Sequence, residues 1–144
     1  MRITSPPDLA VRLRLAITRT SRRLRQEAGT GLSPTLTAAL ASIDRHGPLT
    51  PSELAAREWV QRPTATRLVA RLEALGVVQR AADPADLRSS LLSVTPEGRA
   101  LLETMRGRKD AYLASRLTRL DPEERAALDR ACAILERLLE EDRA

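Results

Sequence analysis

The chain has 144 residues, a length that predicts one domain or one domain with extensions. Hydrophobic residues make up 42% of it, but Phe is absent and Trp and Tyr occur once each, so the core must be aliphatic. The formal net charge of +5 indicates a mild bias toward polyanions, and a single Cys excludes an internal disulfide framework. Because no long apolar run or signal-like segment is present, we expect a soluble cytoplasmic protein without a membrane partner.

Two helices are predicted in the first third of the chain. The first runs from about Pro7 to Ala28, where apolar residues recur near helical spacing, and Gly29 ends it. The second runs from about Pro34 to His46, and Gly47 is expected to provide a left-handed stop. Both helices begin at a Pro, a residue that is tolerated in the first helical turn.

The next two helices form a helix-turn-helix pattern. Thr50 to Glu53 reads Thr-Pro-Ser-Glu, a capping box that opens a short helix from about Pro51 to Arg57. A further helix is expected from about Pro63 to Leu75, where Gly76 stops it. Two helices joined by a few residues, the second of which carries Arg, are typical of this motif.

A hairpin is predicted after the second of these helices. Residues 77–80 and 91–95 are apolar and β-branched enough to form strands. The segment between them contains Asp83-Pro84 and Asp86, which favour a turn. A helix-turn-helix followed by a hairpin is a winged helix.

Two long helices complete the chain. The first opens at Pro96 and runs to about Leu120, and a second capping box at 121–124 opens the last one. The last helix carries an apolar stripe at Leu128, Cys132, Leu135 and Leu139. A winged-helix core is too small to cover the stripes of three flanking helices, so we expect a second copy of the chain to cover them.

The helix at 63–75 has two contrasting sides on a helical wheel at about 100° per residue. The side predicted to be buried holds Gln61, Ala65, Leu68, Leu72 and Leu75, with Val69 at its edge. The opposite side holds Arg62, Pro63, Thr66, Arg67, Ala70 and Arg71, with Thr64 at its border. Such a face is either a solvated, ion-paired surface or a nucleic-acid contact. Since Glu73 is the only acid between Glu58 and Asp83, the sequence favours the nucleic-acid contact.

Three consecutive segments resemble the MarR family of dimeric bacterial transcription regulators. They are GPLTPSELAAR, RPTATRLVARLEALGVV and DPADLRSSLLSVTPEGRALL, and they match the family's helix-turn-helix, recognition helix and wing in that order. The resemblance implies that Arg88 enters the minor groove of DNA while Asp86 orients it. The alternative for this pair is a solvated hairpin tip with an incidental ion pair.

The chain departs from the family pattern at the turn and in the wing. Trp59 stands where a Gly is usual, and we expect it to pack on the core rather than contact a partner. Gln61 or Arg62 takes the N-cap position, where Ser is common, and Leu87 replaces a basic residue. These departures concern the geometry of the turn and the backbone contacts of the wing.

Other reactive or charged residues have ordinary interpretations. Cys132 is expected to be a buried structural thiol rather than an oxidation sensor, and His46 to interact with the end of its helix. The cluster of Arg22, Arg23 and Arg25 is either a phosphate contact, a dimer contact or a solvated face, and we favour the last. No catalytic set or metal-binding cluster is evident, which predicts neither an enzyme nor a cofactor.

The sequence thus predicts a mainly α fold with a small β-hairpin wing, a winged helix-turn-helix at 34–98 between dimerisation helices at 1–33 and 99–144. We expect a sequence-specific transcriptional regulator, a repressor that binds a pseudo-palindromic operator in double-stranded DNA as a homodimer. The resemblance implies that a small phenolic or anionic effector binds between the dimer helices and the DNA-binding lobe. The rival interpretation is a winged helix that contacts proteins without a specific DNA site, and an enzyme is the weakest alternative.

Overall fold

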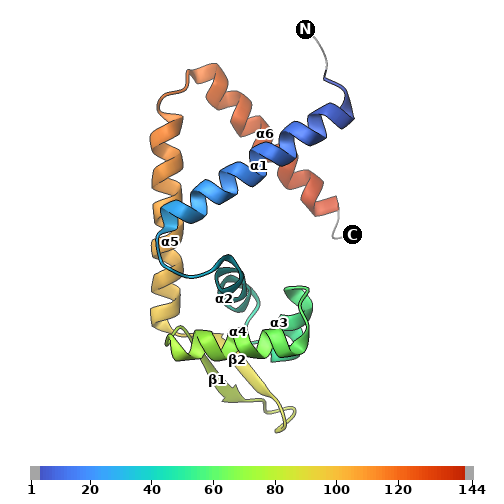
Figure 1. Ribbon diagram of the computed structural model, residues 1–144, viewed down its shortest axis with the longest axis vertical. Helices are drawn as coiled ribbons and strands as arrows, with labels where there is room; N and C mark the ends of the chain where they lie inside the picture. Colours follow the sequence, from blue (N-terminus) through green and yellow to red (C-terminus); the bar gives the residue numbers. More distant parts are fainter. Residues whose placement is uncertain (1–3, 142–144) are drawn as a thin grey trace.

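The computed structural model describes residues 4–141, which form six helices and one antiparallel hairpin. The elements are α1 (Pro6–Ala28), α2 (Pro34–His46), α3 (Pro51–Arg57), α4 (Arg62–Ala74), β1 (Val78–Ala82), β2 (Ser90–Val94), α5 (Pro96–Leu117) and α6 (Pro122–Glu141). A lobe made of α2, α3, α4 and the hairpin lies at one end, and α1 and α6 lie at the other (Figure 1). The helix α5 runs from the lobe to the far end. The predicted winged-helix architecture is confirmed, with boundaries that shift by no more than three residues.

Side-chain caps explain where most of these helices begin. Ser5, Ser33, Thr50 and Thr95 each accept a hydrogen bond from the backbone N–H three residues further on. The predicted capping boxes are both present, since Thr50 and Glu53 bond reciprocally and so do Asp121 and Glu124. Contacts within one helical turn therefore account for the starts of these helices.

The glycine at the end of α2 plays a different role from the one predicted. Gly47 has φ −68° and ψ 160°, an extended conformation rather than the left-handed one. A Cβ atom at this position would lie 2.4 Å from the carbonyl oxygen of Ile43. The sequence-based expectation was wrong because Gly47 is required for close backbone approach, whereas Gly29 at the end of α1 does adopt the left-handed conformation with φ 62°.

The lobe is built around a dry aliphatic core. Leu40, Ile43, Leu54, Leu72 and Leu92 are its largest fully buried side chains. The helix α4 contributes Ala65, Val69 and Leu72, whereas Gln61 and Leu75, which the helical wheel placed on the buried side, are exposed. These two residues lie beyond the two ends of α4, where the core no longer reaches the helix.

The hairpin is anchored to the lobe at its base. Its register pairs Val78 with Val94 and Ala82 with Ser90. Leu49, which lies between α2 and α3, forms a further antiparallel bridge with Leu92. A single bridging residue between two helices leaves no pattern in the sequence, so this bridge was not predicted. The hydroxyl of Thr95 donates to the carbonyl of Gly76 at 2.7 Å, so the end of the hairpin and the start of α5 are fixed to the end of α4.

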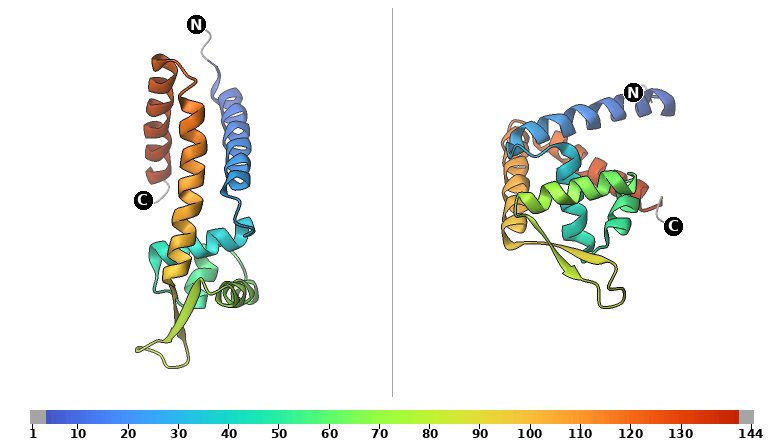
Figure 2. Two further views of the ribbon diagram at one scale, coloured as in Figure 1. Left: turned by 90° about the vertical axis from the view of Figure 1, so that its left-hand side faces the viewer. Right: turned by 60° about the horizontal axis from the view of Figure 1, so that its bottom comes forward.

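Polar contacts join the lobe and α1 to α5. Asp44 of α2 lies 3.4 Å from Arg106 and 3.8 Å from Arg99. Arg108 donates to the carbonyl of Ala28 at 2.9 Å, which satisfies one of the free carbonyls at the end of α1. These contacts link the lobe and α1 to α5, and the left view of Figure 2 shows an elongated molecule.

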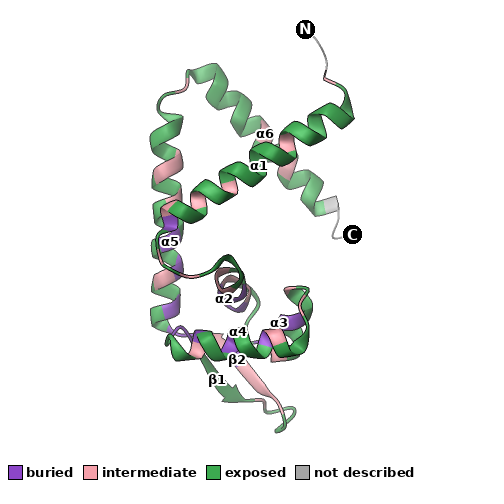
Figure 3. Ribbon diagram, in the orientation of Figure 1, coloured by how far each residue is buried: buried purple, intermediate pink, exposed green. Residues whose placement is uncertain are grey.

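The long helices leave much of their apolar surface uncovered. In Figure 3 burial is concentrated in the lobe and in the adjoining part of α5, while α1 and α6 are mostly exposed. The exposed large apolar side chains of this part are Leu9, Val11, Leu15, Ile17, Leu117, Leu128, Ile134, Leu138 and Leu139. Cys132 is exposed as well, contrary to expectation, because α6 buries none of its residues 122–140 within its own chain. None of the helices between residues 4 and 141 combines the length and apolarity needed to cross a membrane.

Candidate nucleic-acid interface

The helix α4 presents a basic face to solvent. Ala65, Val69 and Leu72 bind it to the core and so determine which side points outward. The exposed side holds the predicted residues Arg62, Pro63, Thr66, Arg67 and Arg71, and Thr64 is half-buried at its border. The structure thus brings all six predicted α4 residues onto one surface, which we call the basic face.

The charges of the basic face are not neutralised within the described chain. The carboxylate of Glu73, the acid of α4, lies 2.7 Å from Arg80 of β1 and is therefore engaged by the hairpin. None of the three arginines of the basic face forms an ion pair between residues 4 and 141. Arg67 makes only a long contact of 3.5 Å with the hydroxyl of Thr64. The basic face is thus exposed to solvent but is not an ion-paired surface within the described chain.

The start of α4 is open to an anion. Gln61 occupies the N-cap position but makes no side-chain cap hydrogen bond, unlike the caps of α1, α2, α3 and α5. No acid lies in the first turn of α4, and Arg62 stands at its first position. A helix N-terminus carries partial positive charge and favours phosphate, so here the backbone and the arginines attract the same partner.

The tip of the hairpin holds the second predicted pair. The carboxylate of Asp86 accepts a hydrogen bond from the backbone N–H of Arg88 at 3.0 Å, and Asp83 does the same for Ala85 at 2.9 Å. Asp86 therefore holds the backbone of Arg88 rather than its guanidinium group. No ion pair joins the two side chains in the described structure, and Arg88 is exposed.

The two sets of residues lie on the same end of the molecule but remain separate. Figure 1 shows α4 along the lower edge of the lobe, with the hairpin extending beyond it. The right view of Figure 2, which brings this end forward, shows α4 exposed along its length beside the hairpin. The geometry therefore offers one broad contact along α4 and a second, smaller contact at the hairpin tip.

Trp59, in the turn between α3 and α4, does not pack on the core as expected. Its side chain is 95% exposed, and its φ of 55° is the one positive value among non-glycine residues within residues 4–141. A left-handed conformation costs an ordinary residue about 1–2 kcal/mol. The next residue, Val60, is half-buried instead. The sequence indicated an unusual turn here, because Trp59 stands where the family pattern usually has a Gly.

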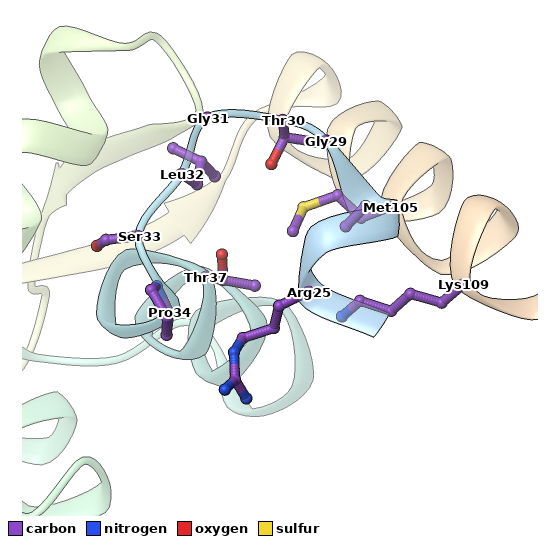
Figure 4. A pocket seen from close by; sticks show the side chains of 11 residues that line it. Arg25, Gly29, Thr30, Gly31, Leu32, Ser33, Pro34, Thr37, Met105 and Lys109 are labelled. Carbon is purple, nitrogen blue, oxygen red and sulfur yellow. The ribbon is translucent and has the colours of Figure 1, made fainter. Parts of the chain in front are cut away.

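A pocket of about 350 Å³ lies where α1, α2 and α5 meet (Figure 4). Its lining combines apolar atoms of Leu32 and Met105 with two cations, Arg25 and Lys109. Neither cation forms an ion pair with a described residue. Arg23, by contrast, pairs with Glu27 at 2.6 Å and lies over the ring of Tyr112. Arg23 and Arg25 of the predicted arginine cluster therefore lie in different environments.

Sequence comparison identifies the family. Residues 32–90 match the model of the MarR family. An uncharacterized HTH-type transcriptional regulator of Mycobacterium bovis is 36% identical over 140 residues, which cover 96% of this chain and 98% of the relative. The chain belongs to the MarR family. The resemblance to this family that the sequence analysis found is confirmed. The chain is a DNA-binding transcriptional regulator rather than an enzyme.

One solved structure and one further relative are also similar to this chain. The crystal structure of a putative transcriptional regulator from Pseudomonas aeruginosa matches with a TM-score of 0.83 and 36% identity, covering 94% of this chain and 98% of the other. The HTH-type transcriptional repressor MdtR of Bacillus subtilis is 34% identical over 94 residues, 65% of this chain and 61% of that protein.

No group of three His, Cys, Asp or Glu side chains within residues 4–141 is arranged to hold a metal ion.

Proposed function

We propose that this MarR-family protein is a repressor that binds a pseudo-palindromic operator as a homodimer. Each subunit inserts α4 into a major groove and Arg88 into the adjacent minor groove. The observation that carries the proposal is the basic face, whose arginines have no acidic partners in the described chain. A duplex supplies the missing counter-charge through its phosphates, and its base edges match the planar donors of Arg.

The residues of the basic face divide into two roles. Arg62, next to the open N-terminus of α4, lies where a phosphate is favoured, and Thr64 offers a hydroxyl beside it. Arg67 and Arg71, one and two turns further on, occupy the part of the helix that reads base edges. Arg88, held by its backbone at the hairpin tip, suits a narrow minor groove, where negative potential is concentrated.

The uncovered apolar faces of α1 and α6 support the homodimer. A large apolar surface on a soluble chain marks an interaction site. A second copy covers the faces of both chains at once through a twofold axis, and such symmetry matches the two half-sites of a palindromic operator.

Selection of duplexes from a random-sequence library by the purified protein tests this function. We expect an inverted repeat with half-site centres about 10 base pairs apart or a multiple of this. Affinity for the selected duplex should fall steeply as salt rises, because each phosphate contact releases counterions. Recovery of no preferred sequence would contradict a specific regulator and favour the rival, a winged helix that contacts proteins.

Release by a small effector completes the proposal. The pocket of about 350 Å³ lies between the dimerisation helices and the lobe, and a volume of this size suits a small aromatic molecule. Arg25 and Lys109, both without a described ion-pair partner, favour a carboxylate or phenolate on that molecule. An occupant that alters how α1 and α5 meet α2 changes the position of the lobe and so couples the pocket to DNA affinity.

A hydroxylated aromatic carboxylate is a suitable probe for the pocket. We expect it to raise the melting temperature of the free protein and to release the selected duplex. The double variant Arg25→Ala/Lys109→Ala should keep its DNA affinity without the probe but no longer respond to it. An equal response of the wild type and the double variant would show that the probe binds elsewhere.

A further inference from the structure

We propose that Trp59 contacts the sugar-phosphate backbone of DNA beside the start of α4, which adds an aromatic contact to the interface. This inference rests on the proposed function, because it requires α4 to dock on DNA. It concerns a residue at which the chain departs from the pattern of its family.

Trp59 is the most exposed large apolar side chain between residues 4 and 141, at 95%. Most of the other exposed apolar side chains belong to the uncovered faces of α1, α5 and α6, which a second copy of the chain explains. Trp59 lies at the opposite end of the molecule, in the turn that leads into α4 (Figure 1). The dimer therefore does not account for the exposure of this indole.

The surroundings of Trp59 select an anionic partner. Its neighbour Glu58 is turned away, since its carboxylate accepts a hydrogen bond from the hydroxyl of Ser42 on α2. The nearest arginines in sequence, Arg57 and Arg62, are both exposed and form no ion pair with a described residue. The acid of the turn is thus engaged with the lobe, while the exposed charges that flank the indole are cationic.

The turn also holds Trp59 in a defined position. The backbone N–H groups of Trp59 and Val60 donate to the carbonyls of Ala56 and Ala55 at 3.4 and 3.1 Å. The indole N–H of Trp59 has no hydrogen-bond partner among residues 4–141. An indole offers an apolar ring to a deoxyribose and one N–H donor to a phosphate, so both of its parts match the DNA backbone.

The chain itself provides the reporter for this contact, because Trp59 is its only tryptophan. Selective excitation of the indole in the presence of the duplex selected by the wild type measures its access to acrylamide. We expect DNA to reduce acrylamide quenching of Trp59 at least severalfold. The matched control is Trp59→Gly/Tyr112→Trp, which moves the indole to α5; its quenching should not change with DNA.

Affinity measurements separate this inference from the function on which it rests. Trp59→Gly suits the φ of 55° and should fold, yet bind the duplex on the order of tenfold more weakly. Trp59→Phe, which keeps a ring but loses the donor, should fall between the two. If the wild type binds no duplex specifically, the proposed function fails. If Arg67→Ala weakens binding but Trp59→Gly does not, and the indole stays open to acrylamide, only the Trp59 contact is overturned and a protein partner is favoured instead.

Discussion

The winged-helix lobe and the long helices are built from the same kinds of aliphatic residue, but they bury them differently. In the lobe, Leu40, Leu54 and Leu72 are fully covered by other elements of the same chain. In α6, Leu128 and Leu139 remain 46% and 66% exposed. The lobe thus completes its core within one chain, whereas the long helices leave their apolar faces uncovered within one chain.

The largest effect is expected from charges placed in the uncovered face of α6. Leu128 and Leu139 lie on the same side of the helix, and Leu128→Asp/Leu139→Asp would bury unpaired carboxylates in a dimer. Sedimentation velocity should show a monomer, and affinity for the selected duplex should fall about 100-fold or more as the avidity of two lobes is lost. The control Arg130→Asp, on the opposite side of α6, should stay dimeric. A dimeric double variant would disprove this interface.

A smaller but local effect is expected in the lobe. Leu72→Ala leaves a cavity in a fully buried position and should lower the free energy of unfolding by about 2–5 kcal/mol. Urea unfolding measures this loss, and it should be similar in the dimer and in the monomeric α6 variant, because Leu72 is fully buried within its own chain and far in sequence from α6. A loss confined to the dimer would mean that the lobe depends on its partner.

The basic face should affect DNA binding without affecting either core. Arg67→Ala should weaken binding to the selected duplex by about 1–3 kcal/mol and relax specificity at one position of the half-site. Arg88→Ala should also weaken binding while the melting temperature stays unchanged. The control Arg119→Ala removes the same charge beyond the end of α5, away from the lobe, and should bind like the wild type (Figure 1). Equal binding by all three variants would refute the proposed docking.

The smallest effect concerns the joint between the two regions. Asp44→Asn removes the charge that faces Arg99 and Arg106, but both arginines are more than half exposed. Such surface pairs contribute about 0–1 kcal/mol, so thermal unfolding should shift only slightly. The control Asp110→Asn changes an exposed acid of α5 without an ion pair in the described chain. A large loss for Asp44→Asn alone would show that the contact between α2 and α5 contributes much more to stability than an ordinary surface ion pair.

Local signals explain how much of the fold could be predicted from the sequence. Caps at Ser33, Thr50 and Thr95 and prolines after them act within one helical turn, so the starts of helices followed from sequence alone. The basic face followed from helical periodicity, because a period near 3.6 separates its two sides. The pair at the hairpin tip came from the family resemblance. The resemblance also implied a ligand site between the long helices and the lobe, but not its lining residues Arg25 and Lys109, since the lining comes from segments far apart in the chain.

The errors share a physical cause. Cys132 was expected to be buried because it lies on the apolar stripe of the last helix, and Trp59 was expected to pack on the core. Within one chain, however, burial depends on which surface the other elements cover. The core ends before α6 and before the turn at Trp59, so both side chains are exposed. Gly47 was assigned a left-handed conformation from its place after a helix, whereas the close approach of Ile43 decides it.

The sequence by itself determined the order and starts of the helices, the outward direction of the α4 arginines and the family, because these depend on spacing over a few residues. Only the tertiary structure decided that Glu73 pairs with Arg80 and that Glu58 is bonded to Ser42. Such pairings depend on how helices and strands approach one another in space. They leave the cations of α4 and its preceding turn without acidic partners among the described residues, and so available to DNA.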